Sequence, residues 1–184
     1  MKKLLRYLHF KRKATNRHGI HSPFLYQFLD EVVYAKNIQK SSPPKKRRKE
    51  FLLYLKMFSY FKVDRIFLSQ SDAFFNQLLK AYHSLNPNVV YKTYHSKEIS
   101  SQQYNIYILN TPDNQIEISN AIQSSPNKNN TIVIIPQIRA SKEQHALWES
   151  IKKEQFTRVS LEFYHFGLVF LRTENSIEHF KIRY

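Results

Sequence analysis

The chain has 184 residues, a formal net charge of +15 and no cysteine. This length is enough for one domain with a substantial hydrophobic core, and the lack of cysteine excludes disulfides, thiolate nucleophiles and cysteine-type metal sites. No apolar run approaches the ~20 residues of a membrane-spanning helix. The basic N-terminus does not have the pattern of a signal peptide, because Arg6 and His9 interrupt its apolar residues. The cytoplasm is therefore the expected location.

The positive charge is concentrated in the first third of the chain. Residues 1–65 hold 17 of the 29 Lys and Arg and 4 of the 14 Asp and Glu, which gives 17 − 4 = +13, whereas residues 66–184 hold 12 and 10, which gives +2. A basic front on a nearly neutral body predicts an anionic partner, which is a nucleic acid, an acidic protein or a lipid surface. The alternative is a solvated surface that only keeps the protein soluble.

The first predicted helix is Lys2–Lys13. Leu4, Leu5 and Leu8 fall on one side of it and cations fall on the other, so it is an amphipathic basic helix. Such a helix can lie on a membrane surface or pack on its own domain.

A second helix is predicted after Ser22, which is a good N-cap, with Pro23 at the first helical position. Six apolar residues then recur at helical spacing: Phe24, Leu25, Phe28, Leu29, Val32 and Val33. Just before them, His18 and His21 suggest a metal site only weakly, because no third ligand is nearby. Hydrogen bonding within the turn is the preferred interpretation, and Gly19 is expected to supply an unusual backbone angle there.

A cationic cluster of five consecutive residues follows the break at residues 41–44: Lys45, Lys46, Arg47, Arg48 and Lys49. One interpretation is a patch that binds phosphate or another anionic partner. The other is the exposed first turn of an apolar helix at residues 51–61. Cations at a helix N-terminus oppose the helix dipole, and this mismatch slightly favours the binding patch.

Strands and helices are predicted to alternate from residue 65 onward. We expect strands at residues 65–68, 89–94, 104–109, 131–135, 156–164 and 168–172, and helices at residues 74–85, around 118–122 and after 141. The helix at 74–85 has an apolar stripe that ends at Leu85. This order predicts an α/β fold with a mostly parallel sheet.

The last third of the chain is predicted in more detail. Ser141 and Gln144 have the spacing of a capping box, and Leu147, Trp148 and Ile151 fall on one face of the helix that follows. Gly167 connects the last two strands, where a positive φ is expected, so these strands are predicted to form a C-terminal antiparallel hairpin.

Two stretches of the chain resemble one protein family. Residues 14–24 read Ala-Thr-Asn-Arg-His-Gly-Ile-His-Ser-Pro-Phe, and residues 167–172 read Gly-Leu-Val-Phe-Leu-Arg, followed by Glu-His-Phe at residues 178–180. They are similar to an N-terminal "AKNRHGIHSPF" motif and a C-terminal "GIVFFR" and "EHF" pattern in S-adenosylmethionine-dependent class I methyltransferases of Bacteroidetes-type bacteria. The match between the two stretches is sparse.

The resemblance implies a three-layer Rossmann-like methyltransferase domain at residues 63–184, preceded by a basic helical region at residues 1–62. It favours packing of residues 2–13 on the domain, since the family begins with such a segment. Only a short polar segment separates the strands at 89–94 and 104–109, where the family has a helix and another strand. The sheet is therefore expected to lack an edge strand.

The resemblance also implies an S-adenosylmethionine site, from which this chain departs. The family has a glycine-rich loop after its first strand, whereas this chain has Ser69, Gln70, Ser71 and Asp72, and lacks the glycine that allows close backbone approach. Asp72 is better explained as a helix cap. The ribose-binding carboxylate of the family is replaced by Tyr94, which cannot accept hydrogen bonds from both hydroxyls.

Two later strand ends depart from the family as well. Residues 110–112, Asn-Thr-Pro, replace an acid–glycine pair, and Asp113 is interpreted as a helix cap. Residues 136–137, Pro-Gln, replace an acidic pair, and Arg139 stands where an aromatic residue is usual.

These losses predict a degenerate methyltransferase-like protein without methyl-transfer activity, which acts as a binding or structural partner and has no cofactor, catalytic or metal-binding residues. An enzyme would need preorganised groups at the lost positions. One alternative is an active methyltransferase with an atypical S-adenosylmethionine pocket. A second alternative is nucleic-acid binding by residues 2–13 and 45–49, with an affinity that falls steeply as salt is added.

Overall fold

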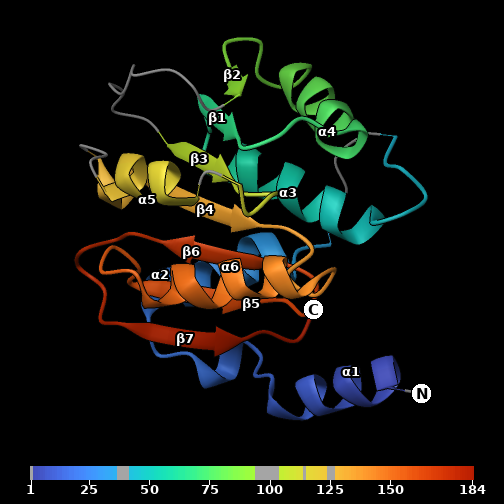
Figure 1. Ribbon diagram of the computed structural model, residues 1–184, viewed down its shortest axis with the longest axis vertical. Helices are drawn as coiled ribbons and strands as arrows, with labels where there is room; N and C mark the ends of the chain where they lie inside the picture. The colour runs from blue at the N-terminus through green and yellow to red at the C-terminus, as the bar shows by residue number, and fades with distance from the viewer. Residues whose placement is uncertain (1, 37–41, 94–103, 114, 124–126) are drawn as a thin grey trace.

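The computed structural model describes residues 2–36, 42–93, 104–113, 115–123 and 127–184 (Figure 1). Its strands form one seven-stranded sheet in the order β2-β1-β3-β4-β6-β5-β7. The strands are β1 (Arg65–Leu68), β2 (Val90–Thr93), β3 (Asn105–Ile108), β4 (Thr131–Ile135), β5 (Val159–Glu162), β6 (Gly167–Phe170) and β7 (Glu178–Lys181). Only β6 is antiparallel to its neighbours. The predicted mostly parallel sheet with a C-terminal antiparallel hairpin is confirmed.

Helices cover both faces of this sheet. They are α1 (Lys2–Lys13), α2 (Pro23–Phe28), α3 (Arg48–Tyr60), α4 (Ala73–His83), α5 (Gln115–Gln123) and α6 (Lys142–Lys153), and a π-helical turn (Leu29–Val33) extends α2. Apolar residues of α2, α3 and α4 form one core with one face of the sheet, and residues of α5 and α6 form a second core with the other face. The molecule is therefore a three-layer, Rossmann-like α/β sandwich, as predicted.

Side chains of the inner parallel strands alternate between these two cores. In β1, Ile66 and Leu68 belong to the core under α3, whereas Phe67 belongs to the core under α6. Tyr107 of β3 stacks on Phe67 at 4.9 Å between ring centroids. Both faces of a parallel sheet are buried, so its strands read as continuous apolar runs.

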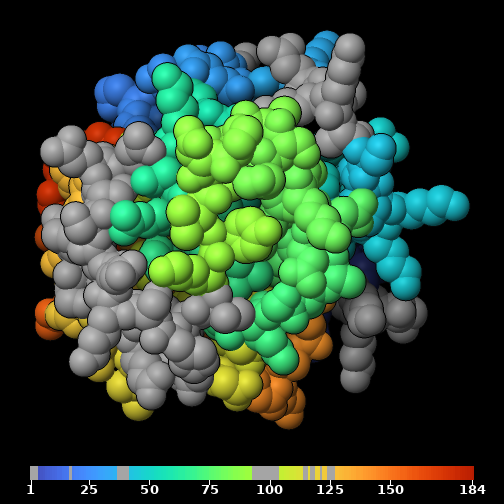
Figure 2. Space-filling model, turned by 90° about the horizontal axis from the view of Figure 1, so that it is seen from above, coloured from blue at the N-terminus to red at the C-terminus, as the bar shows by residue number. Residues whose placement is uncertain are grey.

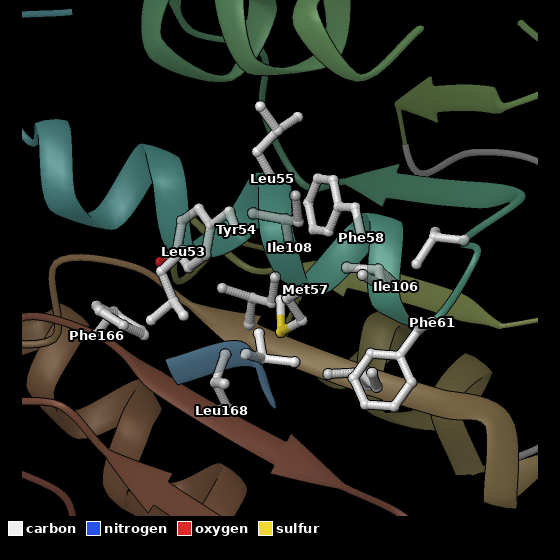
Figure 3. Packing of buried hydrophobic residues seen from close by; sticks show 14 of the residues in the cluster. Leu53, Tyr54, Leu55, Met57, Phe58, Phe61, Ile106, Ile108, Phe166 and Leu168 are labelled. Atoms are coloured by element: carbon white, nitrogen blue, oxygen red, sulfur yellow. The ribbon is translucent and has the colours of Figure 1, made fainter. Parts of the chain in front are cut away.

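Helix α3 is the most deeply buried helix of the larger core. Its side chains pack on Ile106, Ile108 and Leu168 of the sheet (Figure 3), and it also contacts α4 and the π-helical turn. Burial on several sides explains why nearly all of its residues from position 50 to 58 are apolar, since a helix that is hydrophobic all round lies in the interior.

Helix caps agree with the sequence in three places. The side chains of Ser22, Asp72 and Ser141 accept hydrogen bonds from backbone N–H groups at the starts of α2, α4 and α6. The predicted capping box at α6 is wrong for Gln144. Its side chain does not reach back to Ser141 but donates to the carbonyls of Leu109 and Pro136. Helix α4 also ends earlier than expected. Leu85 lies beyond it and is 49% exposed.

The edge strand β7 was missed by the sequence analysis. It pairs with β5 in parallel, with Glu178 opposite Val159. The segment after α1 joins the same edge, because Thr15 N–H donates to the carbonyl of Lys181 at 2.8 Å and Arg183 N–H donates to the carbonyl of Thr15 at 2.9 Å. Strand β7 is short and half-exposed, so no apolar run marks it in the sequence. At the opposite edge, β2 is the outermost described strand.

Helix α1 touches the body through only part of its surface. Tyr7 and Phe10 pack against the ring of Tyr164, with centroids 5.0 and 5.3 Å away. The three leucines of the predicted apolar stripe are 63%, 59% and 51% exposed at positions 4, 5 and 8. The helix therefore packs on the domain through its aromatic residues and presents its leucines outward. No described helix is long and apolar enough to cross a membrane.

The expected positive φ at Gly167 is wrong, as is the unusual angle at Gly19, since neither glycine has a positive φ. The left-handed residue of the hairpin is Tyr164, with φ 65°. Gly167 is needed for close packing instead, because an added Cβ would lie 2.3 Å from Cζ3 of the buried Trp148. At Gly19 an added Cβ would lie 2.1 Å from Oγ1 of Thr15.

Replacing Gly167 with alanine is expected to lower the free energy of unfolding by about 1–3 kcal/mol, because the new methyl group forces the Trp148 ring or β6 to move. Denaturant unfolding followed by the fluorescence of Trp148 measures this change. Gln155→Ala, at an exposed position, is the control and should change stability by less than about 0.5 kcal/mol. Equal stability of Gly167→Ala and the wild type would contradict the packing account.

Candidate functional site

The carboxyl ends of β1 and β3 lie side by side, because these strands pair in parallel with Leu68 opposite Ile108. In open α/β sheets, ligands bind in crevices outside the carboxyl ends of the strands. The loops that begin at Ser69 and Asn110 therefore define the crevice in which the sequence predicted a vestigial cofactor pocket.

Side-chain hydrogen bonds join these two loops directly. The Ser69 hydroxyl donates to Oδ1 of Asn110 at 2.8 Å, and the backbone N–H of Gln70 donates to the same oxygen at 3.0 Å. Nδ2 of Asn110 donates to the carbonyl of Gln70 at 2.7 Å. In return, Ser69 Oγ accepts from the backbone N–H groups of Asn110 at 3.0 Å and Thr111 at 3.3 Å. We call this set the Ser69–Asn110 bridge.

The bridge occupies groups that a ligand at this crevice would need. Three backbone N–H groups, those of Gln70, Asn110 and Thr111, already donate to side chains of the opposite loop. Both polar atoms of the Asn110 amide are also satisfied, so a ligand would have to replace several hydrogen bonds at once.

The remaining residues of the predicted pocket have other roles. Asp72 caps α4, with its Oδ1 accepting from Phe75 N–H at 2.8 Å, and the Ser71 hydroxyl bonds to the Asn76 side chain at 2.7 Å. The side chain of Gln70 is exposed, and Tyr94 lies outside the described residues. Asp113 accepts from the Thr111 hydroxyl at 2.7 Å, and residue 114, just before α5, is also outside the described residues.

The basic cluster does not form a uniform exposed run. The side chains of Lys45, Lys46, Arg48 and Lys49 are exposed, and Figure 2 shows this segment, in cyan, protruding beside the green surface of α4. Arg47 is turned inward. Its guanidinium lies 3.7 Å from the centroid of the Phe74 ring, so Arg47 differs in orientation from the other four cations.

Arg47 forms a buried network with Glu50 and Tyr54. Nε and Nη2 of Arg47 donate to the two carboxylate oxygens of Glu50 at 2.8 and 2.6 Å, and the Tyr54 hydroxyl donates to Oε1 at 2.8 Å. Burial opposes the charge of Arg47, but the hydrogen bond and charge of Glu50 outweigh it and raise the pKa of Arg47. Burial, assisted by Glu50, raises the pKa of Tyr54 well above its usual value. An acid at the third helical position therefore offsets the cations that begin α3.

A cavity of about 560 Å³ opens beside this network. Its walls come from α1, the start of α3, the β5–β6 hairpin and the last residues of the chain. They are Tyr7, Phe10, Lys11, Arg47, Arg48, Lys49, Glu50, Gln137, Phe163, Tyr164, His165, Phe166, Ile182, Arg183 and Tyr184. None of the residues 69–72 lines it. The sequence analysis missed this cavity, because its walls are scattered over the whole length of the chain.

Unusual backbone angles cluster around the same cavity. Four non-glycine residues have positive φ among those that the structure describes, and three of them are cavity residues: Arg47 at 58°, Gln137 at 51° and Tyr164 at 65°. Such angles are uncommon and cost free energy, and they gather at functional sites where the surrounding contacts hold them.

Arg139 holds the hairpin wall of the cavity. Its guanidinium forms an ion pair with the buried Glu162, donates to the carbonyl of Tyr164 and lies 4.6 Å from the centroid of the Tyr164 ring. Arg139 therefore has a structural partner on β5. Arg139 thus contacts both the backbone and the ring of Tyr164, which has a left-handed conformation.

The described part of the chain contains no group of three or more His, Cys, Asp or Glu side chains placed to hold a metal ion. His18 and His21 are exposed. At this turn the backbone N–H of His18 donates to Oδ1 of Asn16.

Comparison with protein-family models, with curated proteins and with solved structures finds no match to this chain. The site is therefore interpreted from its own geometry.

Replacing Asn110 with alanine is expected to lower the free energy of unfolding by about 1–3 kcal/mol, because it removes three side-chain hydrogen bonds and leaves the N–H of Gln70 without its partner. Native-state hydrogen exchange should also become faster at Gln70. Asn88→Ala, at an exposed asparagine, is the control. Unchanged stability and unchanged exchange in Asn110→Ala would show that the bridge does not hold the loops together.

Proposed function

We propose that this protein is a degenerate methyltransferase-like protein without methyl-transfer activity that acts as a binding partner for an anionic molecule. The single observation that supports the proposed loss of activity is the Ser69–Asn110 bridge. It joins two loops, and the resemblance places the adenosyl cofactor between them. A bare glycine backbone would leave such a crevice open, whereas a serine and an asparagine fill it with mutual hydrogen bonds.

Two further features support the loss of cofactor binding. Asp72, the acid nearest to the first strand end, is engaged as the cap of α4. After β4, where the family has an acidic pair, Gln137 is exposed and Arg139 pairs with Glu162. At the ends of β1 and β4, Asp72 and Arg139 are thus both engaged in contacts within the protein.

The basic front supports an anionic partner. Residues 1–65 carry a net charge of 17 − 4 = +13, and exposed cations of α1 and of the start of α3 border one cavity. Concentrated positive charge raises the local concentration of anions and speeds their association.

Calorimetric titration with S-adenosylmethionine tests the proposed loss of cofactor binding. We expect no saturable heat, with adenosylhomocysteine giving the same result, because each ligand would have to displace the bridge. Asn110→Ala is the informative companion variant, since it removes the three bridge hydrogen bonds that the Asn110 side chain makes and leaves the two backbone bonds to Ser69 Oγ in place. Micromolar binding of S-adenosylmethionine to the wild type would overturn the proposal and favour an active methyltransferase with an atypical pocket.

A second candidate function is nucleic-acid binding, favoured by the four exposed side chains of the basic cluster. It predicts that affinity for DNA or RNA falls steeply between low and physiological salt, because bound counterions are released from the phosphates. Fluorescence anisotropy with a labelled oligonucleotide at several salt concentrations measures this slope. Affinity that is absent at low salt, or that does not depend on salt, would exclude this function.

A further inference from the structure

We propose that the cavity bordered by Arg48, Lys49 and Tyr184 binds a small phosphate-bearing molecule that also carries an aromatic ring, of the size of a nucleoside monophosphate. The inference deepens the proposed function, because two of these cations belong to the basic cluster. It does not require that the crevice at Ser69 be closed.

The size of the cavity sets the class of ligand. A volume of about 560 Å³ lies in the range of small-molecule sites, roughly 300–1,000 Å³. Inorganic phosphate would leave most of this space empty, and a nucleic-acid helix could not enter it. A single ring joined to one or two anionic groups matches the volume.

The charge of the walls selects an anion. Five cationic side chains and one acidic side chain line the cavity, so that the lining carries 5 − 1 = +4. The acid, Glu50, is already paired with Arg47. Lys11, Arg48 and Lys49 have exposed side chains and form no ion pair with a described residue. Arg and Lys side chains around a partly enclosed space are well suited to bind phosphate.

The aromatic walls select a ring. Tyr184 is 39% exposed, and its hydroxyl donates to the carbonyl of Lys49 at 3.2 Å, which holds the tyrosine beside the cationic residues. Phe163, which packs edge-on against Tyr184 at 5.9 Å between ring centroids, is buried and forms the apolar floor with Phe166. A planar ligand ring can stack on such side chains while its phosphate stays at the cationic rim.

Three residues of the cavity walls have left-handed backbone angles. Arg47, Gln137 and Tyr164 come from three separate segments, yet each has a positive φ where it borders the cavity. Packing of the core alone does not require three such residues around one opening. Walls that are fixed in this way before a ligand binds would lower the cost of binding.

Isothermal titration of the full chain at low salt with AMP, UMP, adenosine and inorganic phosphate tests the inference. Each nucleotide is expected to bind at least about tenfold more tightly than adenosine or phosphate, because only the nucleotides use both the ring and the anion contacts. Failure of both nucleotides to bind, or binding no tighter than that of phosphate, would overturn the inference.

Matched double variants locate the site. Arg48→Gln with Lys49→Gln removes two charges from the rim, and Lys45→Gln with Lys46→Gln removes two charges from the same cluster outside the cavity. The first variant is expected to bind AMP about 10–100-fold more weakly, and the second less than about threefold more weakly. Equal effects would overturn the cavity site and leave only general attraction of anions, which the proposed function already includes.

A pair of tyrosine variants tests the ring contact. Tyr184→Leu is expected to weaken AMP binding by about tenfold, whereas Tyr184→Phe should keep most of the affinity, and Tyr26→Leu, at an exposed tyrosine outside the cavity, should keep all of it. Full affinity in Tyr184→Leu would overturn the stacking contact. If S-adenosylmethionine binds the wild type while the rim and tyrosine variants lose AMP, the proposed loss of methyltransferase activity fails and the cavity site stands.

Discussion

The hydrogen bonds between Ser69 and Asn110 join two neighbouring parallel strands just beyond their carboxyl ends. An α/β sheet of this kind leaves its strand-end loops apart, since each strand is followed by a crossover to a helix layer, and the gap between loops is the usual ligand site. Here the gap is spanned by side chains whose donors and acceptors satisfy one another. The proposed function depends on these hydrogen bonds, because they make the strand-end loops part of the scaffold.

Charged and aromatic side chains also come together at the cavity between α1, α3 and the β5–β6 hairpin. Its walls combine a hairpin of the sheet with two helices that lie outside the sheet. Helix α1 contributes Tyr7 and Phe10, and Arg139 contacts Tyr164 on the hairpin. The buried carboxylate of Glu50 keeps Arg47 turned inward, whereas Arg48 and Lys49 are exposed where they border the cavity. The contacts of Arg47 and Arg139 within the protein thus shape a cavity with charged and aromatic walls.

The sequence predicted the layers of the fold, but it did not predict the tertiary contacts that join distant residues. Apolar runs located the strands of the sheet because burial on both faces leaves a continuous hydrophobic signal, whereas β7 has no such signal and was missed. Gly167 was assigned to a turn from its residue type, but its role is to accommodate the ring of Trp148, a contact 19 residues away in the chain. The Ser69–Asn110 bridge links residues 41 positions apart. Contacts of this kind depend on tertiary packing, and a local pattern cannot reveal them.

A crystal structure of the protein grown with a saturating concentration of adenosylhomocysteine tests the central claim most directly. The account predicts that the loops at Ser69 and Asn110 remain hydrogen-bonded to each other and that no ligand density appears between them. Adenosylhomocysteine seated between these loops in full density, with the bridge broken, would contradict it.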